Sequence, residues 1–116
     1  MDWESQNIRW HQRRPLVVHD WDSAAARPEA TIAGAASAEF TVDGEPSATT
    51  IVETELFLDA YQQARGVAFT REELSAAWAA GLWVRAFNAK KSRVYGRAET
   101  EAFAEEAWER LCRATG

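Results

Sequence analysis

Two short apolar runs near the start of the chain alternate with polar residues and are separated by a basic turn. The runs are Asn7–His11 and Leu16–His19, and Gln12–Pro15 lies between them. A run, a turn and a second run of these lengths are typical of a β-hairpin. A hairpin brings its two ends together, so we expect Asn7 and Asp20 to face one site.

Beyond the hairpin the hydrophobic pattern predicts helices. Pro28–Phe40 is rich in alanine, and Pro28 suits a first helical turn. A second helix is predicted over Ile51–Arg65, ending at Gly66. The loop Thr41–Thr50 separates the two. The apolar side chains predicted to form the buried side of the second helix are Val52, Leu56 and Ala60, with Phe57, Tyr61 and Ala64 beside them.

A third helix is predicted to open with a capping box of Thr70 and Glu73 and to run to about Ala89. It is apolar on nearly every side, which is typical of a central buried helix. Gly81 favours a close helix neighbour at that point, because glycine otherwise weakens a helix. The side chains predicted to be buried are Leu74, Ala77, Trp78, Leu82, Trp83, Val84 and Phe87, with Arg85 and Asn88 as polar residues of the core or its rim.

A fourth helix is predicted from about Glu99 to Arg113. Its expected buried stripe is Phe103, Ala107 and Leu111, flanked by Trp108. Two pairs of opposite charge are spaced four residues apart, and such pairs contribute only a few tenths of a kcal/mol each. The pairs are Glu106–Arg110 and Glu109–Arg113.

Composition is consistent with one folded domain over residues 1–116, because 47% of the residues are hydrophobic and six are tryptophan. The net charge of −5 argues against nucleic acid or an anionic membrane as the main partner. Cys112 is the single cysteine, so an intrachain disulfide is excluded. We see no signal peptide and no apolar run of membrane-spanning length, and we expect a cytoplasmic protein.

The residues around the hairpin suggest phosphoryl-transfer chemistry. Asp2 and Asn7 form the pattern D-x-x-x-x-N, and Asp20 ends the second strand. In kinase-type transfer, an Asp of the catalytic loop orients the substrate hydroxyl, while an Asn and a second Asp hold Mg²⁺ against the nucleotide phosphates. Amide and carboxylate oxygens are suitable ligands for Mg²⁺. If the spacing is accidental, Asp2 is a charge at the chain terminus, Asn7 begins a strand and Asp20 is the first residue of a turn.

On these motifs the chain resembles the aminoglycoside phosphotransferase-like kinases, whose catalytic loop reads H-G-D-x-x-x-x-N and whose metal-binding Asp precedes Trp and an acidic residue. The resemblance implies that Asp2 is the catalytic base and that Asn7 and Asp20 are the metal ligands, with Mg²⁺ and ATP as cofactors and a small-molecule hydroxyl as the substrate. Asp22 then either supports the metal ligands from outside the coordination sphere or caps the following turn. The helical stretch Ala76–Lys91 is also similar to the C-terminal part of that family.

The implied fold is α+β and mainly α: part of the C-lobe of a kinase-like protein, with the catalytic loop, the hairpin and then about four helices packed behind it. The family's His-Gly before the catalytic Asp, its Gly-rich loop and its strand lysine are not found in this sequence. We therefore expect a C-terminal fragment of such a kinase, with weak ATP binding and no useful turnover alone. Apolar surface left uncovered would also favour self-association.

Several alternatives stay open. The chain could instead be a standalone, tryptophan-rich helical interaction module, or a non-functional truncated product. His11 and His19 are expected to be structural histidines, and the arginines of the hairpin, Arg9, Arg13 and Arg14, to be solvated charges. Glu55 and Asp59 could meet a cationic substrate, but a solvated helix face is the preferred interpretation.

Overall fold

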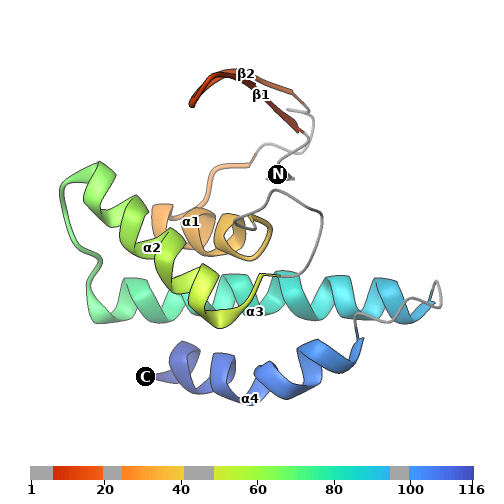
Figure 1. The fold of residues 1–116 in the computed structure, drawn as a ribbon. Helices are drawn as coiled ribbons and strands as arrows, with labels where there is room; N and C mark the ends of the chain where they lie inside the picture. Colours follow the sequence, from red (N-terminus) through yellow and green to blue (C-terminus); the bar gives the residue numbers. More distant parts are fainter. Residues whose placement is uncertain (1–6, 20–24, 41–48, 95–99) are drawn as a thin grey trace.

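The computed structural model describes residues 7–19, 25–40, 49–94 and 100–116 of the chain. Within these ranges the protein is mainly helical, with one small antiparallel sheet, as the sequence predicted (Figure 1). The elements are β1 (Ile8–His11), β2 (Arg14–Val18), α1 (Glu29–Ser37), α2 (Ile51–Arg65), α3 (Arg71–Val94) and α4 (Thr100–Thr115).

The predicted hairpin is confirmed, but its turn is shorter than expected. Strand β2 already begins at Arg14, so the turn consists of Gln12 and Arg13 alone. Gln12 has a positive φ of 55°, which lets the chain reverse within two residues. Pro15 lies in β2 opposite Trp10, a position that proline tolerates because each strand of a two-stranded sheet is an edge strand.

The helices do not cover the hairpin in the way that the sequence suggested. Every residue from Arg9 to Val17 is exposed, and Figure 1 shows β1 and β2 apart from the helices. Isolated two-stranded hairpins are marginally stable in water, because they bury little apolar surface. The prediction that the helices pack behind the hairpin is therefore wrong for this part of it.

Helix α3 is the central helix of the helical part, and α1 packs on one side of it and α4 on the other (Figure 1). A side chain at Gly34 of α1 would overlap the backbone carbonyl of Ala77, and a Cβ at Gly81 would lie 2.9 Å from the carbonyl oxygen of Gly34. The close helix neighbour predicted at Gly81 is thus confirmed. The absence of side chains on both helices allows their backbones to touch.

The ends of α2 are where the sequence placed them. Thr50 caps the first turn by accepting a hydrogen bond from the Glu53 amide, and the Glu53 carboxylate accepts one from the Thr50 amide. Gly66 ends the helix with a φ of 76°, in the left-handed region. Helix α3 continues to Val94, five residues beyond the predicted end at Ala89, because no helix-breaking residue intervenes.

The predicted buried side of α2 is wrong. Val52 and Leu56 are 62% and 57% exposed, whereas Ile51, Thr54 and Leu58 face the core. Apolar residues occur around much of this helix, so its pattern admits more than one buried side. Contact with α1 selects the side that is buried.

The core cluster combines small residues of α1 and α3, namely Ala30, Ala33 and Ala77, with four large members, Ile51, Leu58, Phe69 and Trp78. Trp83 and Phe87, which were predicted to be buried on α3, instead stack on each other at 5.5 Å and are 66% and 53% exposed. The predicted buried residue Leu111 of α4 is 42% exposed. The sequence therefore overestimated how much aromatic and aliphatic surface this fold buries.

Candidate functional site

The open end of the hairpin is where the predicted metal site would lie. The backbone N–H of His19 donates to the carbonyl oxygen of Asn7 at 2.8 Å, and the next pair along the strands is Ile8 with Val18. Asn7 therefore lies beside the residue that immediately precedes Asp20 in the sequence. The expectation that the hairpin brings its two ends together is confirmed for the backbone of Asn7 and His19.

The other three predicted site residues, Asp2, Asp20 and Asp22, lie outside the described residues. Asn7 is half-buried, and its amide oxygen is a ligand type that Mg²⁺ accepts. Among the residues that the structure describes, no group of three or more His, Cys, Asp or Glu side chains could hold a metal ion. The predicted magnesium site at Asn7 and Asp20 stays a prediction.

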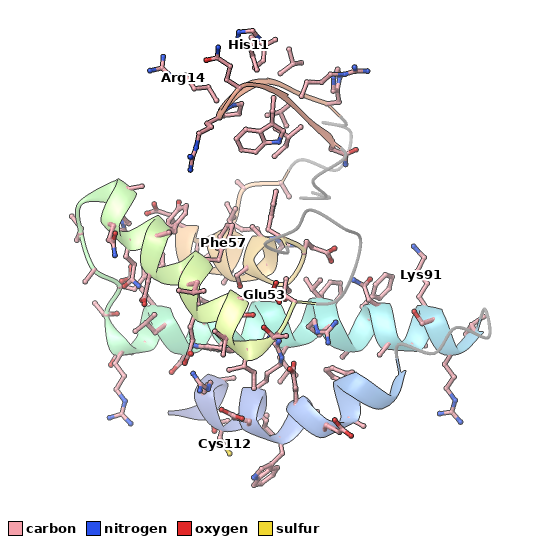
Figure 2. All side chains as sticks on the ribbon, in the orientation of Figure 1. His11, Arg14, Glu53, Phe57, Lys91 and Cys112 are labelled. Carbon is pink, nitrogen blue, oxygen red and sulfur yellow. The ribbon has the colours of Figure 1, made fainter. Side chains whose placement is uncertain are left out.

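Both histidines of the hairpin are exposed, so the expectation that they are structural is wrong for His11 and His19. A histidine without a packed environment has little structural role to play. The arginines Arg9, Arg13 and Arg14 are also exposed, as predicted. Figure 2 shows His11 and Arg14 on the side of the hairpin that points away from the helices.

Arg110 of α4 is the largest fully buried side chain in the described part of the protein. Its guanidinium donates to the Glu106 carboxylate at 2.9 and 3.1 Å, to the carbonyl oxygen of Thr49 at 2.7 Å, and to the Thr54 hydroxyl at 3.2 Å. The sequence suggested only a weak surface pair between Glu106 and Arg110. The expectation of a weak surface pair is wrong, because Arg110 is buried and its hydrogen bonds to Thr49 and Thr54 link α4 to the beginning of α2.

The helical period places Arg110 on the same side of α4 as Phe103, Ala107 and Ala114, which are all partly buried. A charged residue on an amphipathic helix is nevertheless normally assigned to water, so this signal was passed over. Two of its acceptors, the Thr49 carbonyl oxygen and the Thr54 hydroxyl, lie 61 and 56 residues earlier in the sequence. Only the tertiary fold brings these acceptors to it.

A second polar cluster links α1 to α2. The Tyr61 hydroxyl donates to the Glu29 carboxylate at 2.9 Å, and Glu29 also pairs with Arg65 at 3.3 Å. The Arg65 guanidinium lies 4.6 Å from the centre of the Phe69 ring. Burial, and then the hydrogen bond to Glu29, raise the pKa of Tyr61 above its usual value of 10.0. This cluster joins two helices and supplies no nucleophile or free base.

The acidic residues of α2 differ from each other in their surroundings. Glu55 forms an ion pair with Arg113 of α4, and Arg113 also donates to Glu109 at 2.8 Å. These bonds to Glu109 and Glu55 raise the pKa of Arg113, since each stabilises the charged guanidinium. Asp59 is exposed, as predicted, but Glu55 is not a simple solvated charge. Its carboxylate is paired with Arg113 within the protein.

The two polar residues singled out on α3 lie where they were expected. Arg85 is 5% exposed, with its guanidinium 5.8 Å from the centre of the Phe103 ring. Asn88 is half-buried, and its side-chain amide donates to the Glu39 carboxylate at 2.9 Å. Both are polar residues of the core or its rim, which confirms that interpretation.

The thiol of Cys112 is free and exposed. No helix among the described residues is both long and apolar enough to cross a membrane. Comparisons of the chain with models of protein families, with curated proteins and with solved structures gave no match.

Proposed function

We propose that this chain is the C-terminal, metal-binding portion of an ATP- and Mg²⁺-dependent phosphotransferase that acts on a small-molecule hydroxyl. The observation that carries the proposal is the closure of the hairpin, in which the Asn7 carbonyl accepts the His19 N–H at 2.8 Å. Closure places Asn7, which carries a side-chain amide, next to His19, and Asp20 follows His19 in the sequence. Two hard oxygen ligands from the two ends of a hairpin are a suitable basis for a Mg²⁺ site.

In this proposal the roles are divided among few residues. Asn7 and Asp20 would hold Mg²⁺, which would offset the charge of the nucleotide phosphates. Asp2 orients the substrate hydroxyl and accepts its proton. Asp22 either supports the metal ligands or caps the following turn. The substrate class, aminoglycoside-like and cationic, is compatible with the acidic net charge of −5.

Nucleotide-dependent metal binding is the test. Mg²⁺ is added in the presence of ATP while the backbone amide signals are followed by nuclear magnetic resonance. We expect shifts at Asn7, His19 and Asp20, and their loss in the Asn7→Ala and Asp20→Asn variants. Mn²⁺ used in place of Mg²⁺ should broaden the same signals before those of α4.

Asp59→Asn is the matched control, because it removes one exposed carboxylate from α2 without touching the hairpin. It should leave the shifts unchanged. Shifts that survive Asp20→Asn, or broadening that begins on the acidic helices, would contradict the proposed site. We expect metal binding without turnover by the chain alone, since the sequence contains no Gly-rich loop for the nucleotide. Phosphorylation of an aminoglycoside by the purified chain would refute that expectation.

A second candidate function is a helical interaction module. It is favoured by the exposure of the stacked pair Trp83 and Phe87 on α3, because large exposed aromatic side chains are typical of contact surfaces. The same titration separates the two functions. An interaction module should show no shift at Asn7 or Asp20 with Mg²⁺ and ATP.

A further inference from the structure

The hairpin has two chemically different faces. In an antiparallel pair, residues that lie opposite each other project from the same side of the sheet. One face carries apolar pairs, and the other carries basic residues with one valine. The apolar pairs are Ile8–Val18 and Trp10–Pro15, and the basic face consists of the pairs Arg9–Val17 and His11–Arg14.

All four residues of this basic face are exposed, and Val17 is 44% exposed. Figure 2 shows its labelled members, His11 and Arg14, directed away from the helices. The segment 7–19 contains three arginines and no carboxylate, although the chain as a whole has a net charge of −5. This segment of a net-acidic chain therefore carries positive charge without any negative charge.

The side of α4 that points away from the other helices carries acidic and apolar side chains, which complement the basic face. Trp108 is 73% exposed and Leu111 is 42% exposed, and Glu105 and Cys112 are exposed beside them. The arginines of α4 do not balance Glu105 on this side. Arg110 is fully buried against α2, and Arg113 is held by two glutamates. We call the surface formed by Glu105, Trp108, Leu111 and Cys112 the α4 face.

The basic face cannot meet the α4 face of its own chain. Figure 1 shows the hairpin and α4 at opposite ends of the molecule, with α1 and α3 between them. In Figure 2 the labelled Cys112 lies on the side of α4 opposite to those helices. Contact between the two surfaces thus requires two molecules.

We propose that the basic face of one chain docks on the α4 face of a second copy, in a head-to-tail contact. Arginine and tryptophan are a favourable pair, because a guanidinium is attracted to the face of an indole ring. Glu105 supplies the opposite charge for a second arginine, and Val17 and Leu111 supply apolar contact. A polyanion such as nucleic acid is less suitable as the occupant, since the rest of the chain would repel it.

The geometry of this contact determines how the protein assembles. The two surfaces are different, so each added molecule leaves one free basic face and one free α4 face. Growth therefore continues beyond a dimer as the protein concentration rises, unless the chain of molecules closes into a ring. The contact is independent of the metal site proposed above.

Paired variants test this contact. Arg9→Glu combined with Arg14→Glu disables the basic face, and Glu105→Lys combined with Trp108→Ala disables the α4 face. All four side chains are exposed, so the folded state should persist, which circular dichroism checks. Sedimentation should show that the unmodified protein forms species larger than a dimer at low salt, and that each double variant is monomeric.

Matched controls make comparable changes elsewhere. Lys90→Glu with Lys91→Glu reverses two exposed charges on α3, and Asp59→Lys with Leu56→Ala alters the exposed side of α2. Both controls should associate as the unmodified protein does. Raising the salt to about 0.5 M, where the screening length is only a few ångströms, should weaken association at least about tenfold.

Mixing the two double variants is the decisive step. Each retains one intact surface, so a mixture should form a one-to-one heterodimer and nothing larger. A mixture that stays monomeric overturns the proposal, as does an unmodified protein that is monomeric at every concentration. Loss of association in the α2 control, but not in the α4 variant, would identify α2 as the acceptor and would also overturn it.

Discussion

Replacing Arg110 should destabilise the protein far more than an i,i+4 surface pair would suggest. Arg110→Met keeps the length and the apolar part of the side chain but removes every donor. The Thr49 carbonyl oxygen, in a residue that is fully buried, then loses its partner at 2.7 Å. Leaving a buried acceptor unsatisfied costs about 1–3 kcal/mol.

The remaining losses are smaller, and each can be assigned to a partner. Glu106 is 27% exposed, so water can replace part of its charge-assisted bonds to Arg110. The Thr54 hydroxyl keeps its own hydrogen bond to the Thr50 carbonyl at 3.0 Å. Taken together, we expect Arg110→Met to lower the free energy of unfolding by about 2–4 kcal/mol.

Urea unfolding, followed by tryptophan fluorescence and circular dichroism, measures this loss. With a slope of about 1–2 kcal/mol per molar urea, the midpoint should fall by about 2 M. Arg113→Met is the matched control, because Arg113 lies on the same helix and pairs with two glutamates but is 32% exposed. It should cost about 1 kcal/mol or less. Equal losses in the two variants, or a loss below about 0.5 kcal/mol for Arg110→Met, would refute the reasoning.

Two further predictions follow from contacts between helices. Gly34→Ala should lower the free energy of unfolding by about 3 kcal/mol or more, because its Cβ would overlap the Ala77 carbonyl and force α1 away from α3. Gly81→Ala should lower it by about 1–2 kcal/mol, since its Cβ would lie 2.9 Å from the Gly34 carbonyl oxygen and the better helix propensity of alanine offsets part of the strain. Thermal melting measures both losses, and a Gly34→Ala protein as stable as the unmodified one would contradict the close packing. Tyr61 should ionise above its usual pKa in the folded protein, so its stabilising contribution is present below about pH 10 and is lost as the pH rises through the raised pKa. Ultraviolet absorbance of tyrosinate in a Tyr95→Phe background measures this pKa, which Glu29→Gln should lower part of the way; an unchanged pKa would show that Glu29 does not contribute.

Local signals in the sequence located the helices well. The predicted capping box of Thr70 and Glu73 is formed at the start of α3, and the predicted Gly66 ends α2, because capping bonds and a left-handed residue act within one turn. The hairpin was also found from its alternation and its basic turn. The position of the turn was misjudged by two residues, since Pro15 was assigned to it although proline is also acceptable on an edge strand.

The candidate site was also predicted from the spacing of residues. The structure supports it only through the pairing of the two neighbouring strands. The pairing of Asn7 with His19 follows from the hairpin register. What the spacing could not reveal is that the hairpin is exposed from Arg9 to Val17. That outcome depends on where the helices lie.

The sequence by itself determined the elements: a hairpin, four helices, both ends of α2 and a glycine contact at Gly81. Only the tertiary structure decided which sides of the helices are buried. Val52 and Leu56 are exposed while Arg110 is enclosed. The physical reason is that capping and periodicity act over a few residues, whereas burial and the satisfaction of polar groups depend on partners far away in the chain, such as the Thr49 carbonyl that holds Arg110.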